Sequence, residues 1–414
     1  MAKKVLAFDF GASSGRAMIG EYDGKLINVT EIHRFSNDTV VTGGRMYWDV
    51  LRLLFEIKTA INKAVKEYEI DAIGIDTWGV DFGLLNEHGE LLANPNHYRD
   101  ERTVGMPEET AKLISPSELY ALTGTQTMRI NTLYQLYYLA HYRPELLAQA
   151  DKMLFMPDLF AYFLTGAKRA EATIASTSNF LDPKTKTFNT ELLSRLGIPT
   201  SILPEIIKPG ETYGMLSEEL CREFDCDPIP VVAVCTHDTA SAVAAAPAEG
   251  DFVYISCGTW SLFGTELSAP VVNAESEKIQ YTNEGGYEGT TRFLKNIMGL
   301  WMIQSVKKEF TEDLSFAEVC EMASKESITS IVDCYDDCFL APKSMIKAVQ
   351  DFCANTNQQV PQTVGEIASV IYNSLAKCYA DTIRGLEKVT GKTYDRIHVV
   401  GGGANAGYLN ELTA

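Results

Sequence analysis

The sequence has little positive charge. Its 414 residues include 36 lysines and arginines against 55 aspartates and glutamates, a formal net charge of −19 at pH 7. A surplus of negative charge repels nucleic-acid phosphates and anionic membrane surfaces, so neither is expected as a partner. An anionic ligand must instead be held locally, by backbone amides, a few cations or a metal ion.

Long apolar runs are also missing. No stretch reaches the roughly 18 apolar residues of a membrane span, and Asp9 interrupts the opening MAKKVLAFDF too early for a signal peptide. The nine cysteines form no Cys-x-x-Cys pair. No histidines stand beside Cys221/Cys226 or Cys334/Cys338 to complete a zinc set. We therefore expect a cytoplasmic protein with reduced thiols.

At this length a single hydrophobic core stops growing, so two domains are expected. One pattern occurs twice: apolar strand, Gly-plus-hydroxyl turn, strand, amphipathic helix, strand. The first copy has strands over 4–9 and 16–21 on either side of its turn at Gly11, and a helix from about Asp49, its expected N-cap. The second copy has its turn at Gly258 and a helix over 364–389, which is expected to end at Gly391. We interpret this repeated pattern as an internal duplication.

The best domain boundary is AAAPAEGD (244–251), a small-residue segment with Pro and Gly. We expect an N-terminal domain at 1–246 and a C-terminal domain at 247–414. The first copy runs on through VVAVCTHDTASAV (231–243) into another strand and helix. The second stops sooner, so the C-terminal domain is expected to lack its last strand and helix.

The two turns suggest phosphate binding, because arrays of free N–H groups hold phosphate oxygens. No Gly-x-x-x-x-Gly-Lys-Ser/Thr loop occurs, and the glycines of GGGANAG (401–407) are mis-spaced for a dinucleotide site. A plain hairpin turn is the alternative. Asp9, directly before the first turn, suits a metal-linked phosphate or a carboxylate that caps turn amides.

His237 and Asp238 follow the apolar strand VVAVC, at the edge where open α/β sheets bind ligands. Asp238 is a candidate general base for a hydroxyl proton, or else an N-cap of the next helix; His237 alone is as well explained as a structural histidine. DTWGVDF (76–82) also ends a strand. Its Trp78 belongs either to a sugar platform or to the domain core.

Together these stretches resemble the FGGY-type carbohydrate kinases along essentially the whole chain. The resemblance is carried by DFGASSGR (9–16), HRFSN (33–37), IDTWGVDFGLL (75–85), YRDERT (98–103), NTLYQL (131–136), MPD (156–158), HDTASAV (237–243), SCGTWSL (256–262), NEGG (283–286), KNIMGLWMIQ (295–304) and VVGGGANAGYLN (399–410). It implies an α/β fold of two duplicated ribonuclease-H-like (actin-like ATPase) domains with a cleft between them. It further implies transfer of the γ-phosphoryl group of ATP, with Mg²⁺, to the 1-hydroxyl of L-rhamnulose in L-rhamnose catabolism.

The same resemblance assigns roles to individual residues. Asp238 would accept the hydroxyl proton, and Asp9 would lie near Mg²⁺. The sugar would contact Gly79, His237, Asp238, Thr239 and Asn296. The nucleotide would contact Ala12, Ser13, Ser14, Gly15, Arg16, Thr259, Gln304 and Gly402, and the N–H groups of 12–15 are expected to face its phosphates.

Two kinds of alternative remain open. One is a kinase for another ketose, such as L-fuculose or xylulose, since a few pocket side chains decide between sugars that differ in one hydroxyl. The other is a non-catalytic relative on the same fold, a sugar sensor or a filament protein. The oligomeric state, monomer or dimer, is left open by the sequence.

Overall fold

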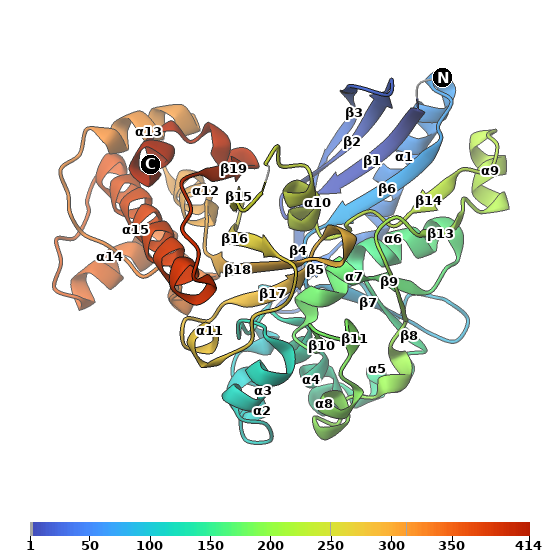
Figure 1. Ribbon diagram of the computed structural model, residues 1–414, viewed down its shortest axis with the longest axis horizontal. Helices are drawn as coiled ribbons and strands as arrows, with labels where there is room; N and C mark the ends of the chain where they lie inside the picture. The colour runs from blue at the N-terminus through green and yellow to red at the C-terminus, as the bar shows by residue number, and fades with distance from the viewer. Residues whose placement is uncertain (1–2, 249, 312) are drawn as a thin grey trace. The chain divides into compact units, whose positions relative to one another are not determined.

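The computed structural model describes residues 3–248, 250–311 and 313–414 (Figure 1). The chain divides into two compact units. The first runs to Ala244 and also contains the short segments Ser268–Val272 and Asn283–Thr291. The second comprises Ala245–Leu267, Asn273–Thr282 and Arg292–Ala414. No sequence pattern indicated that two later segments would belong to the first unit.

A six-stranded sheet forms the centre of the first unit, in the order β13-β14-β6-β1-β2-β3. Its strands are β1 (Lys3–Phe10), β2 (Ser14–Tyr22), β3 (Ile27–Ser36), β6 (Ala72–Thr77), β13 (Thr212–Met215) and β14 (Pro230–Val232). β6 runs parallel to both β1 and β14, whereas the β1–β2, β2–β3 and β13–β14 pairs are antiparallel. The carboxyl ends of β1, β6 and β14 therefore meet at one edge.

Alternation of side chains explains how the sheet is covered. On β1, Leu6, Phe8 and Phe10 are at most 1% exposed, as expected for one buried face of a strand. Helix α1 (Val50–Glu67) packs against β1, β2 and β3. The Asp49 side chain accepts a hydrogen bond from the Arg52 N–H, which confirms the predicted N-cap.

The rest of the first unit is mainly helical and has its own hydrophobic core, built around Leu133, Leu136, Phe155 and Phe180. Its helices are α2 (Met106–Thr110), α3 (Pro116–Thr123), α4 (Thr132–Tyr142), α5 (Pro144–Leu147), α6 (Met156–Thr165), α7 (Ala172–Ala175), α8 (Thr190–Arg195), α9 (Glu218–Phe224) and α10 (Asp238–Ala244). Short strand pairs connect them: β4 (Thr39–Thr42) with β5 (Arg45–Trp48), β7 (Phe82–Leu85) with β8 (Lys152–Phe155), β9 (Arg169–Glu171) with β12 (Glu205–Ile207), and β10 (Leu181–Asp182) with β11 (Thr187–Phe188).

A second sheet, whose strands lie mostly in the second unit, repeats the pattern of the first; residues 283–285 at its edge belong to the first unit. Its order is β17-β18-β16-β15-β19, with β17 (Thr282–Gly285), β18 (Thr291–Ile297), β16 (Ser261–Leu267), β15 (Val253–Cys257) and β19 (Ile397–Val400). β15 pairs antiparallel with β16 and parallel with β19, as β1 does with β2 and β6. This matching topology confirms the duplication.

Several helices accompany this second sheet. They are α11 (Ala274–Lys278), α12 (Trp301–Glu309), α13 (Phe316–Ser324), α14 (Met345–Asn355), α15 (Val364–Thr390) and α16 (Gly407–Thr413). The long helix α15 is the counterpart of α1, and it ends as predicted at Gly391, which caps it in the left-handed conformation. Among the described residues, no helix is long and apolar enough to cross a membrane.

Three strand boundaries differ from the predicted ones. β1 and β2 extend further toward each other than expected, which leaves residues 11–13 as the turn and places Ser14 and Gly15 within β2. β14 ends at Val232 instead of Cys235. Beyond it the chain turns to other partners, because the Ala233 N–H donates to the Glu211 carbonyl.

Candidate active site

Three aspartates gather at the carboxyl edge of the first unit's sheet. Asp9 on β1 is the register partner of Asp76 on the parallel strand β6. An isolated parallel bridge joins Thr77 to His237, so the chain beyond β14 continues beside β6 and brings Asp238 to the same edge. Because ligands of open α/β sheets bind at this edge, we take it as the candidate active site.

Asp76 is the acidic residue here that sequence reasoning did not include among the site residues. Its Oδ1 is buried and has no hydrogen-bond partner within the described chain. Burial, and then the charges of Asp9 and Asp238, raise the pKa of Asp76 well above its ordinary value. The available signal was the occurrence of two aspartates at the ends of two predicted neighbouring strands.

Asp9 is compensated by a neighbouring cation. It accepts hydrogen bonds from Arg16 at 2.8 Å from Nε and 2.7 Å from Nη2, across the β1–β2 pair. Both side chains keep more than a third of their surface exposed. The Asp9–Arg16 ion pair is therefore accessible to solvent or to a ligand.

Asp238 is the first residue of α10, and its backbone is not the N-cap. The Ala240 and Ser241 N–H groups donate to the His237 carbonyl, so His237 occupies the capping position. The Asp238 carboxylate accepts from the Thr239 N–H at 2.6 Å. Burial raises the pKa of Asp238 and the charge of Asp9 adds to the rise, whereas His237 and the Thr239 N–H oppose it. A carboxylate made more basic in this way suits a general base.

His237 lies between two carboxylates. Its Nε2 is 3.4 Å from Asp238 Oδ1, and its Nδ1 is 3.3 Å from Glu284 Oε2. The side chains of His237 and Glu284 are 7% and 6% exposed, whereas that of Asp238 is 35% exposed. The pair His237–Glu284 is therefore internal, and Asp238 is the member that faces outward.

A buried glutamate fixes the chain that leads to His237. Glu171 accepts hydrogen bonds from the Thr236 N–H at 3.1 Å, from the Thr236 hydroxyl at 2.7 Å and from the Thr173 N–H at 2.8 Å. The Thr173 hydroxyl in turn accepts from the His237 N–H at 3.3 Å. This network sets the backbone position from which His237 and Asp238 project.

Trp78 belongs to the core and forms part of a hydrogen-bonded cluster around Asp81. Asp81 Oδ2 accepts from Trp48 Nε1 at 2.6 Å, from Trp78 Nε1 at 3.1 Å and from the Tyr98 N–H at 3.1 Å. Gln135 Nε2 donates to the other oxygen at 3.0 Å. The structure thus supports the core alternative for Trp78. Gly79 follows directly, with Thr177 against it.

The first predicted phosphate turn is short and well defined. The Gly11 N–H donates to the Ser14 carbonyl at 2.9 Å, and the Asn37 side chain donates to the Gly11 carbonyl at 2.9 Å. Within the described residues, the N–H groups of Ala12 and Ser13 make no hydrogen bond. Ser14 and Gly15, the other two residues of the expected array, lie within β2, where Gly15 pairs with Phe10 of β1 and Ser14 with Ser36 of β3.

The second turn, residues 258–260, joins β15 to β16 in the second unit. The Gly258 N–H donates to the Trp260 carbonyl at 2.8 Å. The start of α12 supports this turn, because the Trp301 N–H donates to the Thr259 carbonyl at 3.0 Å. Gln304 lies one turn further along α12, so the structure brings Thr259 and Gln304 to the same region of this unit.

Gly299 is required where this turn meets α12. Its φ is +42°, and an added Cβ would lie 2.4 Å from the Trp260 carbonyl carbon. We expect Gly299→Ala to lower the free energy of unfolding by about 1–3 kcal/mol. Urea unfolding measures this effect. Gly407→Ala, where a Cβ meets nothing within 4 Å, is the control. Wild-type values for Gly299→Ala would contradict this prediction.

Cys257 has a packing role beside the glycines after β19. It is 1% exposed, burial raises the pKa of its thiol, and a Cβ on Gly403 would lie 2.1 Å from its sulfur. Gly402 is exposed. The segment 402–405, which it begins, contacts β15 close to the second turn. Asn296 lies near the end of β18, half-buried.

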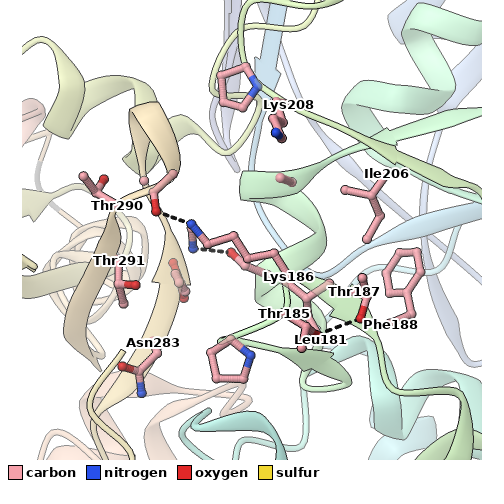
Figure 2. A pocket seen from close by; sticks show the side chains of 18 of the residues that line it. Leu181, Thr185, Lys186, Thr187, Phe188, Ile206, Lys208, Asn283, Thr290 and Thr291 are labelled. Carbon is pink, nitrogen blue, oxygen red and sulfur yellow. Dashed lines mark hydrogen bonds between the residues drawn. The ribbon is translucent and has the colours of Figure 1, made fainter. Parts of the chain in front are cut away.

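A cavity of about 870 Å³ lies within the first unit. Figure 2 shows the β10–β11 hairpin on one side of it and Thr290 and Thr291 on the other. Lys186, from the hairpin, crosses over and donates a hydrogen bond to the Gly289 carbonyl. Glu284 also lines this cavity, so the cavity borders the His237–Glu284 pair.

The carboxylates at this sheet edge are of the kind that can ligate a divalent cation. Within the described part of the chain, no group of three or more His, Cys, Asp or Glu side chains is placed to hold a metal ion by itself. Asp76 nevertheless carries an orphaned buried oxygen beside the charges of Asp9 and Asp238. Mg²⁺ needs only one or two carboxylates when water and phosphate oxygens complete its coordination.

Comparison with known families places the chain in a class. The family model described as "FGGY family of carbohydrate kinases, N-terminal domain" matches residues 4–245, and the corresponding C-terminal model matches 253–414. The two matches cover nearly the whole chain. The chain belongs to the FGGY family of carbohydrate kinases.

Individual curated relatives give a more specific comparison than the family models. The chain is 42% identical to the rhamnulokinase of Bacteroides thetaiotaomicron, over all of this chain and 86% of the relative. It is 42% identical to that of Halalkalibacterium halodurans, over 99% of this chain and 87% of the relative. The rhamnulokinase of Bacillus subtilis is 40% identical, with 99% and 84% covered.

Solved structures share the two-domain α/β fold. A xylulose kinase from Lactobacillus acidophilus superposes with a TM-score of 0.81 at 19% identity, over all of this chain and 84% of the other. A Plasmodium falciparum glycerol kinase with ADP gives 0.77 at 15% identity, with the same shares covered. At such identities the likeness concerns the fold.

Proposed function

We propose that this chain transfers the γ-phosphoryl group of ATP to the 1-hydroxyl of L-rhamnulose. The observation that carries the proposal is the 40–42% identity to proteins named rhamnulokinase along nearly the whole chain. The presence of an acidic sheet edge that includes Asp238 agrees with a transfer enzyme better than with a sugar sensor. We propose that the protein works in the cytoplasm, where ATP is available as the phosphoryl donor.

Asp238 is proposed as the base. As the 1-hydroxyl oxygen bonds to the γ-phosphorus, its O–H bond breaks and the proton moves to the Asp238 carboxylate. The bond from the γ-phosphorus to the β–γ bridging oxygen breaks at the same time, and ADP leaves with that oxygen. The raised pKa of Asp238 makes it a better proton acceptor than an exposed aspartate.

The sugar is proposed to contact Gly79, His237, Thr239 and Asn296 in addition to Asp238. Gly79 and the residues 237–239 come from chain segments that are joined by the Thr77–His237 bridge. Phosphoryl transfer asks chiefly for in-line positioning and charge stabilisation. Glu171 fixes the backbone that leads to His237 and Asp238 at the sheet edge, and this supports the requirement for positioning.

The nucleotide is proposed to contact two sets of residues. The domain at 1–246 offers Ala12, Ser13, Ser14, Gly15 and Arg16, and the domain at 247–414 offers Thr259, Gln304 and Gly402. The free N–H groups of Ala12 and Ser13 are the donors best suited to phosphate oxygens. Mg²⁺ bound near Asp9 would neutralise the charge that develops on the transferred phosphoryl group.

Product analysis tests the proposal. The full chain, incubated with Mg²⁺, ATP and L-rhamnulose, is expected to yield a phosphate monoester whose ³¹P resonance is coupled to the protons of carbon 1. Coupling to any other carbon's protons, or release of ADP without a sugar phosphate, would contradict the assignment of the acceptor hydroxyl.

A further inference from the structure

Two buried cysteines of the second unit lie against each other and have no part in the proposed reaction. Cys334, in the segment between α13 and α14, is fully buried, and Cys378, on the long helix α15, is 8% exposed. Their side chains interact directly, thiol to thiol. Both are free cysteines. Two thiols in contact can form a disulfide when an oxidant takes up their hydrogens.

Two hydrogen bonds hold the segment of Cys334 along α15. The Val332 N–H donates to the Ser374 hydroxyl at 2.9 Å, and the hydroxyls of Tyr335 and Thr382 lie 3.3 Å apart. Three residues at four-residue intervals share one face of this helix: Ser374, Cys378 and Thr382. Cys378 therefore lies midway between the two anchors on the helix, and Cys334 lies between the two anchors on the facing segment. The fold itself places the two thiols opposite each other.

The two thiols differ in acidity. Contact with the thiol and the backbone N–H of Cys334 lowers the pKa of Cys378, although burial, Asp333 and Asp381 oppose the change. Contact with Cys378 and burial raise the pKa of Cys334 well above its ordinary value. The thiolate is the nucleophilic form of a cysteine. Cys378 is therefore the attacking member of the pair, and Cys334 is the member that keeps its proton.

A lysine side chain adds positive charge beside Cys378. The Lys295 Nζ lies 4.2 Å from the centre of the Tyr335 ring, in a cation–π contact. Burial lowers the pKa of Lys295, and the attraction of Cys378 counteracts that change. Because a cation stabilises a nearby thiolate, Lys295 favours the reactive form of Cys378.

Cys338 has the opposite surroundings, although it is close in sequence to Cys334 and more exposed. Burial, and then the neighbouring Asp336, raise the pKa of Cys338 to about 12. A thiol that holds its proton so tightly reacts slowly with oxidants. Exposure alone would therefore select a different cysteine from the one that charge and contact select.

We propose that Cys334 and Cys378 form an oxidative modification site, which hydrogen peroxide converts into a disulfide between the segment 332–340 and α15. The Cys378 thiolate attacks one peroxide oxygen, the O–O bond breaks, and hydroxide leaves and takes up the proton that Cys378 has lost. The Cys334 sulfur then bonds to the sulfur of the Cys378 sulfenic acid. The S–OH bond breaks, and the Cys334 proton leaves with that hydroxyl group as water.

The site is additional to the proposed phosphoryl transfer and does not depend on it. The two sulfurs are oxidised and the peroxide is reduced to two waters. Disulfides in cytoplasmic proteins are usually transient or redox-sensing. We therefore expect the link to be reversible by a dithiol.

Peptide mapping of the full chain after exposure to hydrogen peroxide tests the site. We expect a Cys334–Cys378 link at a lower peroxide concentration than any other, and its loss with dithiothreitol. A second pair in the chain, Cys221 and Cys226, serves as the internal control, because there burial and Cys221 raise the pKa of Cys226. A link between the control cysteines without one between Cys334 and Cys378 would overturn the proposal. So would oxidation of the exposed Cys338 before any link forms.

Variants test the two roles. In Cys334→Ala, dimedone should trap a sulfenic acid on Cys378, because the resolving thiol is gone. In Cys378→Ala, oxidation of Cys334 should be at least about tenfold slower than in the wild type. Cys353→Ala replaces another buried cysteine and should form the link like the wild type. Equal oxidation of Cys334 with and without Cys378 would overturn the proposal. The mapping of the wild-type chain decides the matter even where a variant does not fold.

Discussion

Asp238→Asn is expected to lower kcat for L-rhamnulose by about 10²- to 10⁴-fold, the range that general bases contribute. The asparagine amide has nearly the same shape as the carboxylate but cannot take the hydroxyl proton. The KM for ATP should change little, because nothing proposed for Asp238 involves the nucleotide. Steady-state kinetics with saturating ATP measure the effect.

A matched control accompanies this variant. Asp227 is an exposed aspartate of the same unit, and Asp227→Asn should retain wild-type kcat. Thermal unfolding of both variants shows whether the fold is kept. A well-folded Asp238→Asn protein with kcat within a few-fold of the wild type would contradict the base assignment.

Asp81→Ala is expected to lower the free energy of unfolding by about 3–5 kcal/mol, because it leaves several buried donors unsatisfied. The two indole N–H groups of Trp48 and Trp78 and the Tyr98 N–H all donate to one Asp81 oxygen. Urea unfolding measures the loss. A loss below about 1 kcal/mol, the scale of a surface substitution, would contradict this account of the cluster.

Asp81 also imposes a pH dependence whose sign follows from its pKa. Burial raises the pKa of Asp81 in the folded protein to about 6, from 3.8. A raised pKa means that the folded state holds the proton more tightly. The contribution to stability is therefore full below about pH 3.8 and is lost as the pH rises through about 6.

Asp81→Asn isolates this effect, because its amide stays neutral at every pH. Relative to the wild type, its free energy of unfolding should rise between pH 4 and pH 7, by up to roughly 3 kcal/mol. Urea unfolding of both proteins across this range gives the difference. A difference that is flat with pH, or that falls, would contradict the assignment.

Much of the fold was predictable because its signals are local. The spacing of apolar residues and the caps at Asp49 and Gly391 identified the helices α1 and α15. The repeat of the Gly11 turn at Gly258 identified the duplication, which the two sheets confirm. Each of these signals lies within a few residues of the structure that it predicts.

The misses concern contacts between distant parts of the chain. The approach of Glu284 to His237 depends on the return of residues 283–291 to the first unit, and no local pattern encodes that return. Asp76 ends a predicted strand, but its pKa is raised by burial and by two other aspartates that the fold brings to its strand end. The first turn is narrower than predicted because Gly15 pairs with β1 and Ser14 pairs with β3.

The central claim, that L-rhamnulose is the substrate of this chain, is tested most directly by ADP release measured with L-rhamnulose, L-fuculose and D-xylulose under one set of conditions. Ketoses that differ in single hydroxyls are distinguished by the few polar groups that meet those hydroxyls. We predict a kcat/KM for L-rhamnulose at least about tenfold above the other two. Equal values for all three sugars, or no turnover of L-rhamnulose, would contradict the account.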